Sequence, residues 1–173
     1  MVFLFRLLSL LPLSLLHALG GALGRLVYWL SPTYRRHLRD NMAQAGIDVA
    51  LRGAVAAETG KQMIELARIW MRPLDEAVPL VAEVTGWEHV EAARAAGKGI
   101  VFLTPHLGCF EITAQYLSSF GDITVLYREP KSATANELIL MGRKRAQLHL
   151  APADLSGVRA LIKALKKGRS EER

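Results

Sequence analysis

Cysteine is almost absent from this sequence, which has one such residue, Cys109, among 173. A single cysteine excludes an internal disulfide and any zinc site built from several thiolates, and it fits a reducing compartment. Internal repeats and low-complexity tracts are also absent. No spacing of His, Cys, Asp or Glu is typical of a metal site, so we predict neither a metal nor a cofactor.

Charged residues are absent from the eighteen positions between Arg6 and Arg25. That length reaches the lower limit for a membrane-spanning helix, although Pro12, His17 and three glycines interrupt the run. Three interpretations stay open: a membrane anchor that spans or lies in the interface, a cleaved signal peptide, and a plain buried helix. We favour the anchor and assign it to residues 1–30.

Basic residues outnumber acidic ones over the whole chain, by 22 to 16, which gives a net charge of +6 and a pI near 9.8. Such a charge favours phospholipid, nucleic acid or an acidic protein as partner. The cluster Arg35, Arg36, His37 and Arg39 follows the apolar run, so it is expected on the cytoplasmic side near anionic head groups. Because the positive charges are dispersed and no aromatic-basic motif accompanies them, nucleic acid is disfavoured.

Residues 31–173 read as one domain in which helices and strands alternate. Ser31-Pro32 predicts a helix start, and the apolar spacing predicts helices whose buried stripe includes Met63, Ala67 and Trp70. The expected helices are 33–45, 48–72, 90–96, 110–118, 136–146 and 156–167. The expected strands are 80–84, 100–104, 123–127 and 148–151, of which 100–104 reads as buried on both faces. This alternation predicts a layered α/β fold.

The segment Thr104-Pro105-His106-Leu107-Gly108-Cys109-Phe110-Glu111 lies between a predicted strand and a predicted helix. The carboxyl ends of strands are where α/β folds place their sites. His106 is a natural general base, because its ordinary pKa lies near working pH. A bend at Gly108 would fold Glu111 back beneath the imidazole, where a carboxylate fixes the tautomer.

The start of the following helix offers free N–H groups for a developing oxyanion, and we assign Gly108 to the substrate site. A structural His and Glu remain the alternative to a catalytic pair. Cys109 offers a further alternative, a thiol nucleophile with His106 as its base.

The motif TPHLGCFEI resembles the His-x4-Asp/Glu signature of glycerolipid and lipid A acyltransferases. Its final glutamate is similar to that of the lipid A late acyltransferases. The stretches YRRHLRDNMAQAG, GKQMIELARIWMRP, VTGWEHVEAARAAGKGIVFL, ITVLYREPKSATANELI and MGRKRA also resemble that branch. The resemblance covers nearly the whole chain, and it implies a layered α/β/α acyltransferase fold with a partial sheet behind an N-terminal membrane-anchoring helix.

The resemblance implies that His106 deprotonates a hydroxyl on a lipid A precursor while Glu111 orients the imidazole. That oxygen would attack the thioester of an acyl carrier protein at the cytoplasmic face of the inner membrane. Arg128 resembles an arginine that holds phosphate or the acceptor lipid, and Arg143 and Arg145 are further substrate-binding candidates. A solvated surface position is the alternative for each arginine.

The resemblance also implies further strands beyond the last helix, so we expect the domain 31–173 to be incomplete at its C-terminal end. A non-catalytic, membrane-associated remnant is therefore an alternative function. Another is a phospholipid or glycolipid acyltransferase that uses acyl-CoA.

Overall fold

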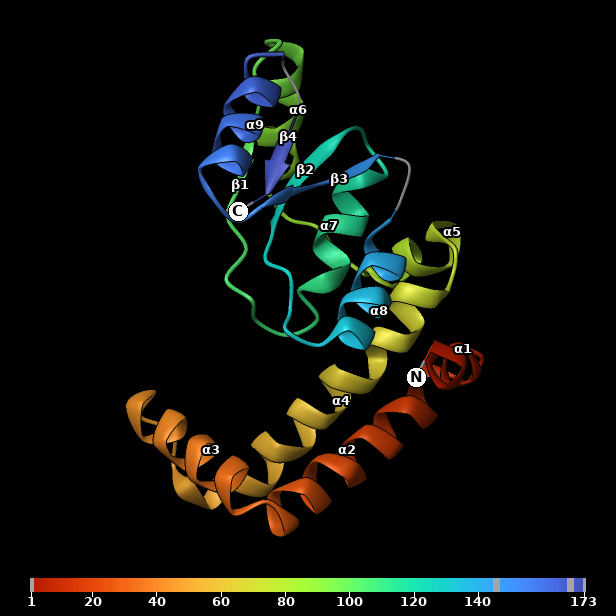
Figure 1. Cartoon of the computed structure of the whole chain (residues 1–173), viewed down its shortest axis with the longest axis vertical. Coiled ribbons are helices and arrows are strands. Elements are labelled where there is room, and N and C mark those ends of the chain that lie inside the picture. The colour runs from red at the N-terminus through yellow and green to blue at the C-terminus, as the bar shows by residue number, and fades with distance from the viewer. Residues whose placement is uncertain (1, 145–146, 168–169, 173) are drawn as a thin grey trace. The chain divides into compact units, whose positions relative to one another are not determined.

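The structure, a computed structural model, describes residues 2–144, 147–167 and 170–172 (Figure 1). The chain forms two compact units, a helical unit, Phe3–Arg68, and an α/β unit that begins at Ile69. The division falls inside a helix, and the boundary after Leu30 between an anchor and a catalytic domain stays a prediction. The apolar segment therefore belongs to a larger helical unit.

The helical unit consists of α1 (Val2–Ser9), α2 (Leu13–Leu30), α3 (Pro32–Gln44), the 3-10 turn η1 (Val49–Leu51) and most of α4 (Arg52–Met71). The predicted start of α3 is confirmed. The Ser31 side chain accepts a hydrogen bond from the Tyr34 N–H at 3.2 Å, and Pro32 is the first helical residue. Gly46, at φ +67°, follows the end of α3 in the left-handed conformation that a helix stop favours.

Helices α2 and α4 approach so closely that their backbones touch. A Cβ atom on Gly24 would lie 2.0 Å from the Ala56 carbonyl oxygen, and one on Gly60 would lie 2.0 Å from the Gly20 carbonyl oxygen. Only glycine fits at these positions, as in small-residue helix pairs. Tyr28, Leu38, Met42 and Ala56 form the buried cluster that joins α2, α3 and α4.

The predicted buried stripe on α4 is correct in part. Ala67 and Trp70 are buried, but Met63 is 60% exposed. Met63 lines an open apolar cavity together with Gly24 and Gly60. Because these two glycines have no side chains, they do not cover Met63.

The α/β unit contains a parallel sheet whose described strands have the order β1-β4-β2-β3. They are β1 (Val101–Phe102), β2 (Ile123–Tyr127), β3 (Leu148–Pro152) and β4 (Ser170–Glu172). In the register of β2 and β3, Ile123 pairs with Leu148 and Tyr127 with Pro152. The mixed α/β class is therefore confirmed.

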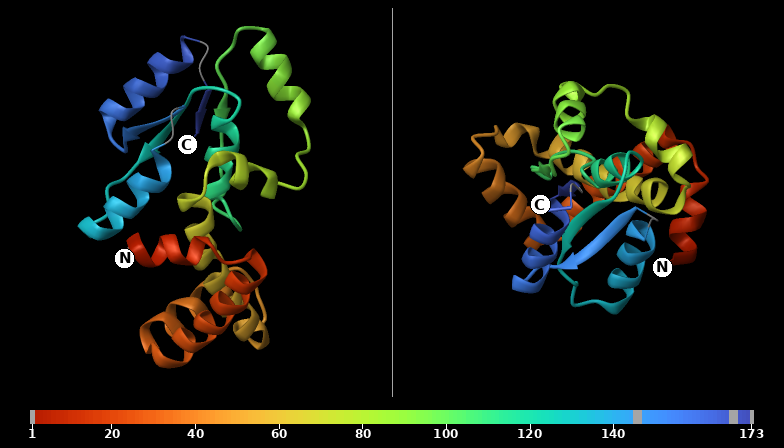
Figure 2. Two further views of the ribbon diagram at one scale, coloured as in Figure 1. Left: turned by 90° about the vertical axis from the view of Figure 1, so that its right-hand side faces the viewer. Right: turned by 90° about the horizontal axis from the view of Figure 1, so that it is seen from above.

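Helices lie on both faces of this sheet. Its helical elements are α5 (Leu74–Ala77), the 3-10 turn η2 (Val78–Leu80), α6 (Trp87–Ala95), α7 (Glu111–Ser118), α8 (Ala133–Arg143) and α9 (Leu155–Leu165). Helices α7 and α8 cover one face and α9 the other (Figure 2), as right-handed crossovers require for this strand order. Leu117, Ile123 and Leu148 form the buried centre of the α7 side.

The strand predicted at 80–84 is wrong. Val78–Leu80 forms a 3-10 turn and an irregular segment follows it, because no neighbouring strand pairs with this stretch in the described part of the chain. Val81 and Val84 instead line an apolar cavity beside Trp87.

The strand predicted at 100–104 is shorter than expected and is not buried on both faces. Only Val101 and Phe102 pair, and they do so with β4 alone, because β1 lies at the edge of the described sheet. Val101 is 52% exposed and Leu103 78% exposed. The prediction also missed β4, whose polar sequence carries no strand signal although it pairs with both β1 and β2.

Candidate active site

The loop between β1 and α7 carries the predicted motif in a sharply bent backbone. His106 has a φ of +54° and Gly108 a φ of +57°. Gly108 adopts this left-handed conformation without strain, which fits the predicted bend, whereas histidine adopts it less commonly. A non-glycine residue held there directs attention to function, because the surrounding fold must impose it.

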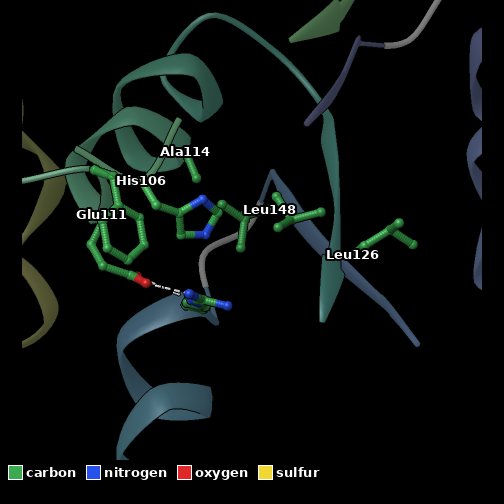
Figure 3. A pocket seen from close by; sticks show the side chains of 8 residues that line it. His106, Glu111, Ala114, Leu126 and Leu148 are labelled. Atoms are coloured by element: carbon green, nitrogen blue, oxygen red, sulfur yellow. Dashed lines mark hydrogen bonds and ion pairs between the residues drawn. The ribbon is translucent and has the colours of Figure 1, made fainter. Parts of the chain in front are cut away.

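The bend brings His106 and Glu111 to one cavity of about 80 Å³ at the sheet, near the start of α7 (Figure 3). Apolar groups from α7, β2 and β3 form much of its wall. The lining residues are His106, Phe110, Glu111, Ala114, Val125, Leu126, Arg143 and Leu148.

The His106 imidazole has a defined tautomer in this geometry. Its Nδ1 lies 3.1 Å from the carbonyl oxygen of Thr104. Because a carbonyl oxygen only accepts hydrogen bonds, Nδ1 carries the proton of the neutral ring and donates it to Thr104. Nε2 is then the nitrogen able to take a proton. The ring also packs on Phe110, with 4.3 Å between ring centroids.

The Glu111 carboxylate is buried, with 8% of its side chain exposed, and it is bound on both oxygens. Trp70 donates its Nε1–H to Oε2 at 3.0 Å, and Arg143 donates Nε–H to the same oxygen at 3.1 Å. Arg143 Nη2 binds Oε1. The pair is thus a bidentate fork, the geometry that best compensates a buried carboxylate.

Gly142 makes this arrangement possible. A Cβ atom at Gly142 would lie 2.2 Å from Cγ of Trp70, so the end of α8 lies directly on the indole. The next residue, Arg143, is thereby held over Glu111. Its Cζ also lies 5.8 Å from the centroid of the Tyr127 ring.

The expected hydrogen bond between His106 and Glu111 is not formed among the described residues. The carboxylate instead binds Trp70 and Arg143. In Figure 3 the dashed line from Glu111 leads away from the His106 ring. The Thr104 carbonyl oxygen sets the imidazole tautomer instead. The physical reason is the strength of the bidentate guanidinium pair, which occupies the carboxylate.

Of the other predicted site residues, some line the cavity and others do not. Arg143 lies in the cavity, whereas Arg128 is exposed and does not line it. Gly108 is at the bend but outside the cavity wall, and Cys109 does not line the cavity either. Arg145 lies outside the described residues.

Arg128 belongs to a loop that is tied to α8. The Tyr127 hydroxyl donates to Asn136 Oδ1, and Asn136 Nδ2 donates to Glu129. Burial raises the pKa of Tyr127, and the Glu129 carboxylate adds to that rise, while Arg143 lowers it. The phenol therefore stays neutral and able to donate to Asn136.

Sequence reasoning missed Trp70 as a site residue and assigned it to the core. It is buried, as that assignment requires, yet its indole N–H reaches a carboxylate 41 positions away. No local signal could reveal that bond, because Trp70 lies on a helical stripe of apolar residues. The pairing of Arg143 with Glu111 was also missed, because the two residues lie 32 positions apart and no pattern of neighbouring residues indicates their contact.

One of two comparisons with known proteins identifies a family. None of the curated proteins compared with the chain matches it. The sequence profile of the bacterial lipid A biosynthesis acyltransferases matches residues 1–171, which include the cavity residues, and it indicates an acyltransferase of lipid A synthesis with a lipid A or glycolipid acceptor. The chain therefore belongs to the bacterial lipid A biosynthesis acyltransferase family.

Proposed function

We propose that this protein transfers a fatty acyl group from an acyl carrier protein thioester to a hydroxyl group of a lipid A precursor, at the cytoplasmic face of the inner membrane. One observation carries the proposal. A histidine whose Nδ1 lies against the Thr104 carbonyl oxygen and a guanidinium held by a buried carboxylate line the same partly apolar cavity. Family membership supports the reaction class.

The reaction divides between these two groups. Nε2 of His106 removes the proton from the acceptor hydroxyl as its oxygen attacks the thioester carbonyl carbon. The new C–O bond forms, the C–S bond breaks, and the proton passes from His106 to the departing sulfur. The products are an ester and a free thiol, so no further reactant is needed.

Arg143 stabilises the negative charge that develops on the carbonyl oxygen. Nε and one Nη2 proton are used by Glu111, which leaves the Nη1 donors available to the substrate. Glu111 and Trp70 act as positioning residues, because they fix the guanidinium before the reaction begins. Preorganised donors of this kind are typically worth about 10²–10³ in rate.

The experiment is acyl transfer by purified membranes from cells that express this chain. The acceptor is a radiolabelled lipid A precursor, and the donors are lauroyl or myristoyl carrier protein in one arm and the matching acyl-CoA in the other. We expect labelled product with the carrier protein, and its loss by about 10²–10⁴-fold in His106→Ala.

The matched control is His89→Ala, because His89 is a histidine whose side chain is 86% exposed and does not line the cavity. It should retain wild-type transfer. Product only with acyl-CoA would overturn the assigned donor. Equal transfer by wild type and His106→Ala would overturn the assigned base.

A further inference from the structure

One face of α2 is an exposed apolar surface, which we call the α2 stripe: Leu15, Leu19, Leu23, Leu26 and Leu30. Their spacing of three or four residues places them on the same side of the helix. Each is between 40% and 73% exposed. Among the described residues, α2 is also the one helix long and apolar enough to cross a membrane.

The opposite face of α2 argues against crossing. Through Gly20 and Gly24 it lies against α4, which carries five charged residues within the helical unit: Arg52, Glu58, Lys61, Glu65 and Arg68. His17 Nε2 lies 2.8 Å from Glu65 Oε2. If α2 spanned the bilayer, it would have to carry the charged helix α4 into the hydrocarbon or separate from it. Either change costs free energy.

The length of α2 supports the same conclusion. Its 18 residues extend about 27 Å at 1.5 Å per residue, less than the roughly 30 Å of a bilayer core. A helix with one apolar face and one face packed on charged protein is suited to lie in the plane of the interface.

The charge of the N-terminal segment fits an anionic surface. Residues 1–39 contain five arginines and no aspartate or glutamate. Each basic residue near such a surface adds to the attraction. The expected partner is therefore a bilayer rich in anionic phospholipid.

Arg25 and a second arginine outside that segment, Arg52, line a separate cavity of about 180 Å³ at the C-terminal half of α2. Its walls are Arg25, Tyr28, Trp29, Ala50, Arg52, Gly53 and Ala56. Arg25 donates to the Gly21 carbonyl oxygen at 3.4 Å, and Arg52 donates to that of Val49 at 3.2 Å. In the described part of the chain neither guanidinium has a carboxylate within ion-pairing distance, so their remaining donors suit a phosphate.

Trp29 places this cavity at the edge of the apolar surface. It is 67% exposed, and Arg25 precedes it by four residues, so the two side chains are neighbours on the helix. Tryptophan favours the head-group level of a bilayer. A phosphate bound at Arg25 and Arg52 would thus lie where a phospholipid head group lies when the α2 stripe faces the acyl chains.

We propose that α2 lies flat on the bilayer, with its stripe toward the acyl chains and the phosphate of an anionic phospholipid bound between Arg25 and Arg52. This inference does not depend on acyl transfer. It concerns the helical unit by itself.

The first test is binding of the full chain to vesicles of phosphatidylglycerol and phosphatidylethanolamine, with phosphatidylcholine vesicles for comparison. Arg25→Gln/Arg52→Gln removes the phosphate donors. Arg36→Gln/Arg39→Gln is the matched control, because it removes the same charge from exposed positions on α3 that do not line the cavity. We expect the first pair to lose at least about tenfold more affinity than the control.

Arg25→Lys/Arg52→Lys keeps the charge and removes the planar fork, so its affinity should be intermediate. A circular dichroism melt of each variant establishes that it is folded. The head-group site would be overturned if Arg25→Gln/Arg52→Gln and Arg36→Gln/Arg39→Gln lost the same affinity. It would also be overturned if the chain bound phosphatidylcholine vesicles as tightly as the anionic vesicles.

The second test measures depth. Leu15, Leu23 and Leu30 are replaced one at a time by cysteine in the Cys109→Ser chain, labelled with a nitroxide and examined by power-saturation paramagnetic resonance on the same vesicles. A flat helix gives three similar depths. A spanning helix gives a deep label at position 23 and shallow labels at 15 and 30, which would overturn the proposal. If the labels are shielded from solvent even without vesicles, a second copy of the chain covers the α2 stripe, and the proposal is overturned.

Discussion

The replacement of Gly142 by alanine tests whether Trp70 positions Arg143 through the end of α8. The new Cβ would lie 2.2 Å from Cγ of Trp70, about 1.2 Å short of an ordinary 3.4 Å contact. Overpacking of this kind costs roughly 1–3 kcal/mol. The higher helix propensity of alanine offsets about 0.5–1 kcal/mol of that cost.

The larger expected effect is on the reaction. Relief of the overlap requires α8 to move by about 1 Å, which shifts Arg143 relative to Glu111. A misplacement of about 1 Å at a site can lower a rate by about 10²-fold. We therefore expect Gly142→Ala to remain folded but to lose about two orders of magnitude in kcat for acyl transfer.

The assay combines urea unfolding with initial rates of acyl transfer. Gly53→Ala is the matched control, because nothing lies within 4 Å of a Cβ atom at that helical position. It should be slightly more stable than wild type and fully active. Wild-type transfer by Gly142→Ala would refute the claim that this contact holds the guanidinium in place.

Three further predictions concern other contacts. Trp70→Phe removes the hydrogen bond from the indole N–H to buried Glu111. Urea unfolding should therefore show a free energy of unfolding lower by about 1.5–3 kcal/mol. An unchanged unfolding midpoint would contradict a stabilising role for this bond. Ser31→Ala removes the cap of α3 and should cost about 1 kcal/mol in the same assay, while Ser14→Ala, at an exposed site, should cost little. Hydrogen bonds from the Ser156 side chain, and from the backbone N–H groups of Gly157 and Ser156, lower the pKa of Asp154. That contribution is therefore complete above the unfolded pKa of about 3.9 and is lost as pH falls through the lower folded value. Asp154→Asn should accordingly lose less stability than wild type between about pH 5 and pH 3, and parallel losses would contradict this reasoning.

Local signals in the sequence were sufficient for the start of α3 and for the bounds of β2. Ser31-Pro32 defined the start of α3, and the apolar run 123–127 matched β2 with the same bounds. Such features depend on neighbouring residues alone. The bend at Gly108 belongs to the same category, because its left-handed φ follows from the need for a turn between a strand and a helix.

Pairings between segments distant in the sequence could not be predicted from local signals. Residues 170–172 become a strand because β1 and β2 flank them, and their own sequence is polar. Likewise the partner of Glu111 depends on how α8 packs against Trp70, which Gly142 controls. The sequence placed both His106 and Glu111 at the site, but tertiary packing decided which group each of them binds.

The central claim is that His106 and Arg143 act on the same step in one cavity. The most direct test is the single-turnover rate of acyl transfer from carrier protein for His106→Ala, Arg143→Ala and the double variant. Residues that act as a unit lose their effects together. The account predicts that the double variant is little slower than the slower single variant. Losses that multiply in the double variant would contradict it.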